Sequence, residues 1–386
     1  SINIAILIPE LEGGGAERIA SLVGNYYVER GHNVYYFLAK DKNKCVYKVY
    51  GKIINTEIVL SDKQNLSLLK SAWIMRKYKR KYKIDVSISF MEEFNYINVL
   101  SKGQDTVITR ICTILSQRED LKKLYLYKKG LIKFMYNHSD KVVVMTNYAM
   151  HEMVAIYGVK RKKLIKIPNS ITKMGKIQKS EPWQYGDKTI ICIGRLEDVK
   201  QHNIAIRAFS TVIKKIPTAK LIILGTGQTK GKLKALIKKM NLENSVFLLG
   251  FKENINYFLQ NSKVFLMTSK TEGFPNSMLE AMSLGIPVVS IDSPGAPREI
   301  LKVSGSGNDI QYGEFGIITP YINHNFLSQK AIMPKEEELG NAICMLLQNQ
   351  EMWEHYSKAS YRRASMYDTE RVMSKWNKLI GLKGGR

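Results

Sequence analysis

The stretch that decides the fold is KVFLMTSKTEGFPNSMLEAMSLGIPVVSI, residues 263–291. It opens with the apolar run 263–268 and closes with the apolar run 286–291, both typical of buried strands. Between them a Gly-Phe-Pro-Asn turn leads into a short helix that stops at Gly285, with Pro287 just beyond. A strand, a helix and a second strand in this order indicate one unit of a parallel sheet.

Similar apolar runs recur along the chain, at intervals filled by helix-like segments. Continuously apolar strands that alternate with helices indicate parallel sheets with helices on both faces. The series runs through the first half and restarts in the second, so we predict an α/β fold of two Rossmann-like domains that face a cleft. The predicted strands are 4–8, 34–38, 86–90, 106–109 and 141–146, followed by 189–194, 220–225, 245–250, 263–268 and 286–291.

The domain boundary is predicted in the polar, aperiodic segment 167–188. The first domain then covers residues 1–175 and the second covers residues 185–366. The remainder of the chain reads as helices, with a break near Tyr367 and Asp368.

The chain is strongly basic, with 59 Lys and Arg against 34 Asp and Glu and a net charge of +25. Such a charge favours partners that carry phosphate, whether nucleic acid, anionic lipid or nucleotide. The four cysteines show no CxxC spacing, which indicates a reduced, intracellular compartment. Cys192 lies in an apolar run and is predicted to be a core residue. We expect neither a signal peptide nor a membrane-spanning helix, because no apolar run is long enough.

Three glycines, Gly13, Gly14 and Gly15, follow the first predicted strand and precede a helix. A glycine loop at a helix start lets backbone N–H groups approach an anion or a sugar closely. The pattern is not GxGxxG, which argues against a dinucleotide site. A flexible turn without a ligand is the alternative for this loop.

Two cations, Arg195 and Lys200, follow the strand at 189–194. Ligands of doubly wound sheets bind beyond the carboxyl ends of the strands, so these side chains are placed to bind a diphosphate. The alternative is a solvated loop in a very basic protein.

Two glutamates, Glu272 and Glu280, flank the start of the helix in the opening stretch. Ser277 and Glu280 have the spacing of a capping box, which predicts that the helix begins at Ser277. The free N–H groups of that helix start form an anion site. Glu280 therefore has a structural alternative as a capping residue, whereas Glu272 has no evident structural task.

These residues together resemble the retaining glycosyltransferases of the GT-B fold, in the family-4 group that includes bacterial polysaccharide and lipid-linked-glycan synthases. The resemblance covers nearly the whole chain. It rests on GGGAER, IPNS, IGRLEDVK, LLGF, EGFPNSMLEAMSLGIPVV and GAPREI, read in that order along the sequence.

The resemblance implies a role for each matching residue, and it implies that the helix at 369–386 packs back on the first domain. Glu272, Arg195 and Lys200 are the implied catalytic residues, with Glu272 at the donor hexose and the two cations at the diphosphate. Glu280 is implied to bind the ribose. The other implied donor-binding residues are Gly14 and Gly15 at the phosphates, Gly250 and Phe251 at the base, and Gly273, Phe274, Pro275, Asn276 and Ser277 at the sugar and the distal phosphate.

The implied reaction moves a hexose or N-acetylhexosamine from a UDP-sugar to a lipid-linked or polysaccharide acceptor, as in capsule or O-antigen synthesis, with an α-glycosidic product. No cofactor and no metal are expected, since the sequence holds no D-x-D motif. Two alternatives are a UDP-sugar 2-epimerase of the same architecture and a protein that binds nucleotide-sugars without catalysis.

One loop departs from the pattern of many relatives, which place a histidine after the fourth strand of the first domain. Here the loop reads VITRICTILSQRED and carries Arg110 instead. The resemblance implies that Arg110 contacts the acceptor or a phosphate.

The basic residues concentrate in three segments of the first half, 70–83, 121–136 and 160–166, and the first two also carry aromatic and aliphatic residues. That composition suits a surface lying on anionic lipid, beside an acceptor carried on a polyprenyl diphosphate. We therefore expect a cytoplasmic protein that is peripheral on the inner face of the membrane. Amphipathic helices that face water are the alternative, and no signature of nucleic-acid binding is present.

Overall fold

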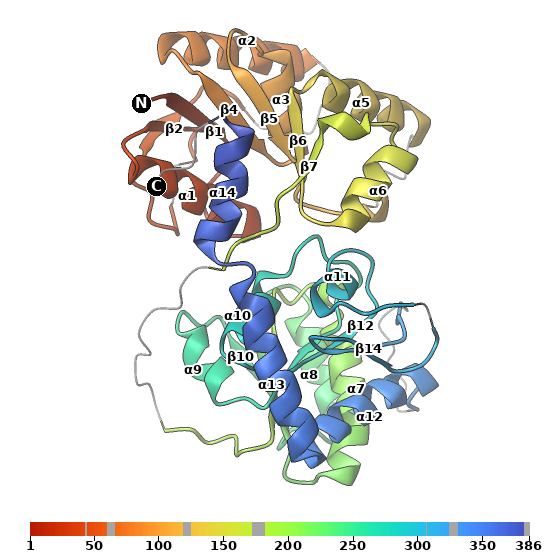
Figure 1. Ribbon diagram of the computed structural model, residues 1–386. Coiled ribbons are helices and arrows are strands. Elements are labelled where there is room, and N and C mark those ends of the chain that lie inside the picture. Colours follow the sequence, from red (N-terminus) through yellow and green to blue (C-terminus); the bar gives the residue numbers. More distant parts are fainter. Residues whose placement is uncertain are drawn as a thin grey trace. The chain divides into compact units, whose positions relative to one another are not determined.

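The structure is a computed structural model that describes residues 1–42, 45–59, 66–118, 125–171, 182–305, 307–323 and 331–381. Within these ranges the chain forms two compact units, drawn in Figure 1. Unit 1 comprises Ser1–Ser170 and Thr369–Arg386, and unit 2 comprises Ile171–Asp368. Each unit holds one sheet, so the prediction of two parallel-sheet α/β domains is confirmed.

The sheet of unit 1 has the strand order β3-β2-β1-β4-β5-β6-β7, and all its strand pairs are parallel. The strand order reverses beside β1, which lies between β2 and β4. In such a sheet, ligands bind outside the carboxyl ends of the strands at this reversal. The strands are β1 (Asn3–Leu7), β2 (Asn33–Leu38), β3 (Lys52–Asn55), β4 (Val86–Phe90), β5 (Thr106–Arg110), β6 (Lys141–Val144) and β7 (Leu164–Lys166).

Helices cover both faces of this sheet (Figure 1). One face packs against α1 and α14, and the indole of Trp376 on α14 is buried in a cluster with Ile4 and Ile6. The other face packs against α2 and α3, through Met75 and Phe94. The helices of unit 1 are α1 (Gly15–Val28), α2 (Leu66–Lys81), α3 (Glu92–Leu100), α5 (Tyr125–His138), α6 (Asn147–Ala155) and α14 (Thr369–Leu379).

The sheet of unit 2 has the strand order β10-β9-β8-β11-β12-β14-β13, parallel except for the pair β13 and β14. Its order reverses beside β8, which lies between β9 and β11. The strands are β8 (Thr189–Ile193), β9 (Lys220–Leu224), β10 (Val246–Gly250), β11 (Val264–Met267), β12 (Val288–Ile291), β13 (Gln311–Tyr312) and β14 (Ile317–Thr319).

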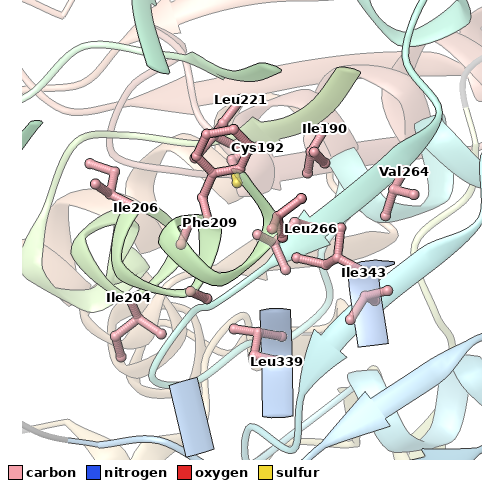
Figure 2. Close-up of a cluster of buried hydrophobic side chains, with 14 of the residues drawn as sticks. Ile190, Cys192, Ile204, Ile206, Phe209, Leu221, Val264, Leu266, Leu339 and Ile343 are labelled. Carbon is pink, nitrogen blue, oxygen red and sulfur yellow. The ribbon is translucent and has the colours of Figure 1, made fainter. Parts of the chain in front are cut away.

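One face of this second sheet carries the cluster in Figure 2, where Cys192 and Leu221 of the sheet pack with Phe209 and Leu339 of the covering helices. Cys192 is buried, as predicted for a core residue. Helix α12 packs on α7, and α13 packs on α10. The helices of unit 2 are α7 (His202–Lys215), α8 (Lys230–Lys239), α9 (Ile255–Gln260), α10 (Asn276–Ser283), α11 (Pro297–Leu301), α12 (Pro334–Gln348) and α13 (Gln350–Ser365).

The chain enters and leaves unit 2 through two segments that lie side by side. Ile171 forms a parallel bridge with Asp368, and its N–H donates to the carbonyl of Tyr367 at 2.9 Å. The helical break near Tyr367 lies at this point, between α13 and α14. Of the linker predicted at 167–188, residues 172–181 lie outside the described residues.

Four short strands, β3, β7, β13 and β14, were not among the predicted ones. Each has two to four residues, and β7 lies in the basic segment 160–166, where charge hides the strand pattern. The segment 70–83 is largely helix α2, and the described part of 121–136 lies in α5. Across the described residues, no helix combines the length and the apolar character needed to span a bilayer.

Candidate functional site

Two loops of unit 2 meet at the point where its strand order reverses. The loop after β8 carries Arg195 and Lys200, and the loop after β11 carries Glu272. Because β8 and β11 are neighbours, their carboxyl ends lie side by side at one edge of the sheet. This is the position at which open α/β sheets bind ligands.

Lys200 and Glu272 form an ion pair at this edge. The Lys200 ammonium lies 2.5 Å from Oε1 of Glu272, and the Ser269 hydroxyl donates to the same oxygen at 2.6 Å. The side chains are 24% and 10% exposed, so the pair is partly screened from water yet open to a ligand. The structure therefore brings together two of the three predicted catalytic residues.

Hydrogen bonds to backbone carbonyls hold the two loops together. The Thr268 hydroxyl donates to the carbonyls of Lys200 and Gln201, and the Lys270 N–H donates to the Val199 carbonyl at 2.7 Å. Gln201 adopts a left-handed backbone conformation with φ of 47°. These contacts fix the direction in which Lys200 leaves its loop.

The backbone of Glu272 is held from the other side by the loop after β12. Its N–H donates to the Pro294 carbonyl at 3.1 Å, and its carbonyl accepts from the Ala296 N–H at 3.0 Å. The backbone that carries the Glu272 carboxylate is thus held on both sides, and fixed groups of this kind are what electrostatic preorganisation requires.

Arg195, the third predicted catalytic residue, points elsewhere. Its side chain is 73% exposed and its guanidinium lies 3.0 Å from a carboxylate oxygen of Glu197. The local pair with Glu197 holds the guanidinium near its own loop in this structure.

A glycine turn after β9, formed by Gly225 and Gly227, supports this loop. A Cβ atom on Gly225 would lie 1.9 Å from the carbonyl oxygen of Gly194, and one on Gly227 would lie 2.4 Å from that of Leu196. Both glycines have positive φ. The turn therefore requires glycine so that the backbone after β9 can lie against the backbone after β8. The G-x-G spacing directly after a predicted strand was the feature of the sequence that could have identified this turn.

A buried histidine, His202, also lies beside the Lys200 loop and was missed. It is the first residue of α7, and burial together with the nearby Lys200 lowers its pKa to about 4. The imidazole is therefore neutral at physiological pH and adds no charge to the site.

The helix start in the opening stretch differs from the prediction. Helix α10 begins at Asn276, and its N-cap residue is Pro275, which makes no side-chain cap. The capping box of Ser277 and Glu280 is wrong, because the Ser277 hydroxyl lies 3.5 Å from the Ile193 carbonyl of β8 instead. Glu280 lies in the second turn of the helix and is buried.

The helix stop is confirmed. Gly285 has φ of 70°, its N–H donates to the Met282 carbonyl, and the Ile286 N–H donates to the Ala281 carbonyl. These two bonds form a Schellman motif, for which glycine is the favoured residue.

The other predicted donor-binding residues of unit 2 lie at carboxyl ends of its strands. Gly273, Phe274 and Pro275 form the turn that leads into α10 at Asn276. The Phe274 ring packs edge-to-face on Tyr367 at 5.6 Å between centroids, so only its backbone remains for a ligand. At the end of β10, Gly250 accepts a hydrogen bond from the Gly225 N–H, and the Phe251 ring is 69% exposed.

The predicted donor-binding residues of unit 1, Gly14 and Gly15, lie where α1 begins after β1. The Gly14 carbonyl accepts a hydrogen bond from the Tyr47 hydroxyl at 3.2 Å. A Cβ atom on Gly14 would lie 2.3 Å from a carboxylate oxygen of Glu17, so a side chain here would require the Glu17 side chain to move.

Arg110, at the end of β5, is fully buried, with 1% of its surface exposed. Its guanidinium donates to the side-chain oxygen of Asn169 and to the Cys112 sulfur at 3.3 Å. It also lies 5.4 Å from the Phe90 ring centroid. The IPNS segment, which contains Asn169, is thereby tied to the end of β5.

Comparison with known proteins agrees with this arrangement. A family described as glycosyl transferases group 1 matches residues 173–310, and glycosyltransferase family 4 matches residues 13–172. An uncharacterized glycosyltransferase of Methanocaldococcus jannaschii is 31% identical over 368 residues, with 86% of this chain and 89% of the relative covered.

Two further proteins are similar over nearly their whole length. An N-acetylgalactosamine-N,N'-diacetylbacillosaminyl-diphospho-undecaprenol 4-alpha-N-acetylgalactosaminyltransferase of Campylobacter jejuni is 28% identical, covering 96% of this chain and 97% of the relative. The crystal structure of Anabaena HepE in complex with UDP and glucose superposes with a TM-score of 0.74 at 15% identity, covering 99% of this chain and all of HepE.

Proposed function

Because the chain belongs to the family-4-type glycosyltransferases of the GT-B fold, we propose that it is a retaining hexosyltransferase that uses a UDP-sugar donor. It moves a hexose or N-acetylhexosamine to a lipid-linked or polysaccharide acceptor and forms an α-glycosidic bond. The observation that carries this proposal is the ion pair of Lys200 and Glu272 at the strand-order reversal of unit 2.

The donor is bound in this proposal by both members of the pair. The Lys200 ammonium interacts with the diphosphate. The Glu272 carboxylate, which no longer pairs with that ammonium alone, accepts hydrogen bonds from the hexose hydroxyls. The start of α10, with its backbone N–H groups and the positive end of the helix dipole, binds the distal phosphate. The Phe251 ring, exposed at the end of β10, stacks on the base. The UDP bound by HepE supports the choice of nucleotide.

The chemistry follows from the charge of the leaving group. The bond between the anomeric carbon and the phosphate oxygen breaks, and negative charge grows on the diphosphate, where Lys200 and the start of α10 oppose it. The acceptor hydroxyl forms the new bond to the anomeric carbon on the same face and gives its proton to the departing phosphate. Since protein cations oppose the charge, we propose a metal-independent reaction.

The acceptor class rests on the Campylobacter relative, whose name specifies a sugar on diphospho-undecaprenol and a 4-alpha linkage. We propose the same chemical class here, a glycan carried on a polyprenyl diphosphate.

The experiment combines donor screening with product analysis. UDP- and GDP-sugars are tested for protection against thermal unfolding, and the best donor is then incubated with short alkyl glycosides and EDTA. We expect a UDP-sugar to protect and the NMR spectrum of the product to show an α linkage. A β-linked product would exclude retention, and conversion of the UDP-sugar without an acceptor would favour the epimerase.

Helix α2 supports a membrane-facing role for unit 1. One stripe of the helix exposes Leu69 and Trp73, at 66% and 60%, and the Lys77 ammonium lies 3.4 Å from the Trp73 ring centroid. Exposed apolar residues among cations match an anionic lipid surface. We therefore propose peripheral binding at the cytoplasmic face of the membrane. The remaining exposed cations of the stripe are Lys70, Arg76, Arg80 and Lys81.

Neutralising this stripe is expected to release the protein from anionic vesicles. Lys70→Gln, Lys77→Gln and Lys81→Gln together remove three charges, each worth about 1 kcal/mol near such a surface. Co-sedimentation with phosphatidylglycerol-containing liposomes measures the bound fraction.

The matched control lies on α8 of unit 2, where Lys234, Lys238 and Lys239 are also exposed but no exposed large apolar residue accompanies them. Their replacement by glutamine changes the net charge by the same amount. Equal binding by both triple variants would show that α2 is not the membrane-facing surface.

A further inference from the structure

The carboxyl edge of the unit 1 sheet contains a polar cluster, at the strand β4 that borders the strand-order reversal. Directly after β4, Met91 adopts φ of 69° and ψ of 149°, a backbone conformation almost restricted to glycine. Such strain persists where the surroundings impose it, and it occurs preferentially at functional sites. Here it directs the next residue, Glu92, at the start of α3.

Glu92 has one engaged and one available carboxylate oxygen. Its Oε2 forms an ion pair with Arg118, whose side chain comes from the loop after β5. Its Oε1 is buried and has no hydrogen-bond partner among the described residues. A buried carboxylate oxygen without a partner is costly, so a ligand that donates a hydrogen bond to it is stabilised.

Arg110 supplies the complementary group. It is 1% exposed, and its Nε is buried without a partner in the part of the chain that the structure describes. Both charges act on the Cys112 thiol: burial raises its pKa, Arg110 lowers it and Glu92 raises it. The guanidinium and the carboxylate therefore act on the same small region at the ends of β4 and β5.

The mixture of charges selects the chemical class of the ligand. A phosphate oxygen can only accept hydrogen bonds, and the Glu92 carboxylate would repel it. A hydroxyl can donate to the carboxylate and accept from the guanidinium at once. Vicinal hydroxyls of a neutral sugar therefore suit this cluster better than the diphosphate of a lipid carrier.

We propose that Glu92 and Arg110 bind the hydroxyls of the acceptor's terminal sugar, with Arg118 holding the Glu92 carboxylate in place. This inference rests on the proposed function, because it names the acceptor site of that reaction. Of the two ligands expected for Arg110, the acceptor and a phosphate, the proposal selects the acceptor. It also adds Glu92, which was not among the residues predicted from the sequence.

The test compares Glu92→Gln with Glu93→Gln, its exposed neighbour on the same helix turn. Losing one hydrogen bond to a charged group is expected to raise the KM for an octyl glycoside acceptor about tenfold to a hundredfold. The donor KM and the thermal midpoint should stay unchanged, and Glu93→Gln should behave as wild type. An unchanged acceptor KM in Glu92→Gln would overturn the proposal.

A binding measurement separates this inference from the proposed function. Octyl glycoside is expected to protect the wild type against thermal unfolding and to lose this effect in Glu92→Gln, whether or not transfer is detected. Protection by inorganic pyrophosphate should not decrease in that variant. If glycoside protection is retained in Glu92→Gln while pyrophosphate protection rises, the cluster is a phosphate site that the Glu92 carboxylate opposes, and the proposal is wrong.

A second variant addresses folding. Glu92→Asp keeps the charge but withdraws the carboxylate by one methylene, and it is expected to raise the acceptor KM in the same direction as Glu92→Gln. If Glu92→Gln unfolds and the folded Glu92→Asp keeps the wild-type acceptor KM and glycoside protection, the residue is structural and the proposal fails.

Discussion

Replacing Lys200 with alanine is expected to reduce sugar transfer by about a thousandfold, the effect of removing one preorganised group that opposes transition-state charge. The ammonium lies at the strand-order reversal of unit 2 and is held by Glu272 and by a loop tied to β11. In Lys200→Ala no ammonium remains there to oppose charge on the departing diphosphate. The measurement is the initial transfer rate at saturating donor, with the thermal midpoint as the test of folding.

The partner residue extends this prediction. Glu272→Ala removes both the proposed hydrogen-bond acceptor for the hexose and the ion-pair partner of the Lys200 ammonium, so transfer is expected to be lost as well. Glu272→Gln keeps the shape but not the charge that holds Lys200. If either Glu272 variant or Lys200→Ala transferred sugar at the wild-type rate, its assigned role would be excluded.

Two variants calibrate the result. Lys214→Ala removes an exposed lysine from the far end of α7 and should leave transfer unchanged. Arg195→Ala is expected to abolish transfer, which requires the exposed guanidinium to leave Glu197 and bind the diphosphate. Wild-type transfer by Arg195→Ala would leave Lys200 as the principal cation of the site.

Much of this architecture could be predicted because buried strands leave a strong pattern. Strand β4 was predicted with the bounds that it has, and β8 to within one residue. The edge strands β3 and β13 were missed because they are short and their partly exposed residues carry little apolar signal. Their existence depends on the neighbouring strand, which is tertiary information.

The candidate site shows a similar division. The meeting of Lys200 and Glu272 follows from the rule that ligand-binding loops lie at the carboxyl ends of strands. The capping box failed because spacing alone does not reveal that the Ser277 hydroxyl lies toward β8. The pairing of Glu92 with Arg118 joins residues 26 positions apart, one at the start of α3 and one in the loop after β5, so no local sequence pattern could predict it.

Replacing Lys79 with methionine is expected to destabilise unit 1 by about 3–5 kcal/mol, the usual cost of leaving one buried charge without its partner. The Lys79 ammonium lies 2.9 Å from Asp105, and their side chains are 4% and 2% exposed. Burial lowers the pKa of Lys79 to about 8 despite Asp105. Hydrogen–deuterium exchange of peptides from β4 and β5 measures the loss within unit 1.

The pH dependence of Lys79→Met follows from its partner. In the wild type, burial would raise the pKa of Asp105, but Lys79 and hydrogen bonds from Ser87 and Gly103 lower it below its ordinary value. Without Lys79, burial dominates and the folded-state pKa rises above the unfolded one. Such a group stabilises the fold at low pH and loses that contribution as pH rises, so the destabilisation should be smaller at pH 5 than at pH 7.5.

A double variant and an exposed pair complete the test. Lys79→Met combined with Asp105→Asn removes both charges and is expected to recover most of the loss. Lys102 and Asp140 form an ion pair in the same unit with side chains 39% and 33% exposed, so Lys102→Met should cost at most about 1 kcal/mol. If Lys79→Met cost no more than Lys102→Met, the buried pair would contribute nothing beyond a surface one. The Lys79 ammonium also donates a hydrogen bond to the Asn98 side chain on α3, the helix that begins at Glu92. The same experiment therefore measures how much this buried pair stabilises the part of unit 1 that carries the proposed acceptor site.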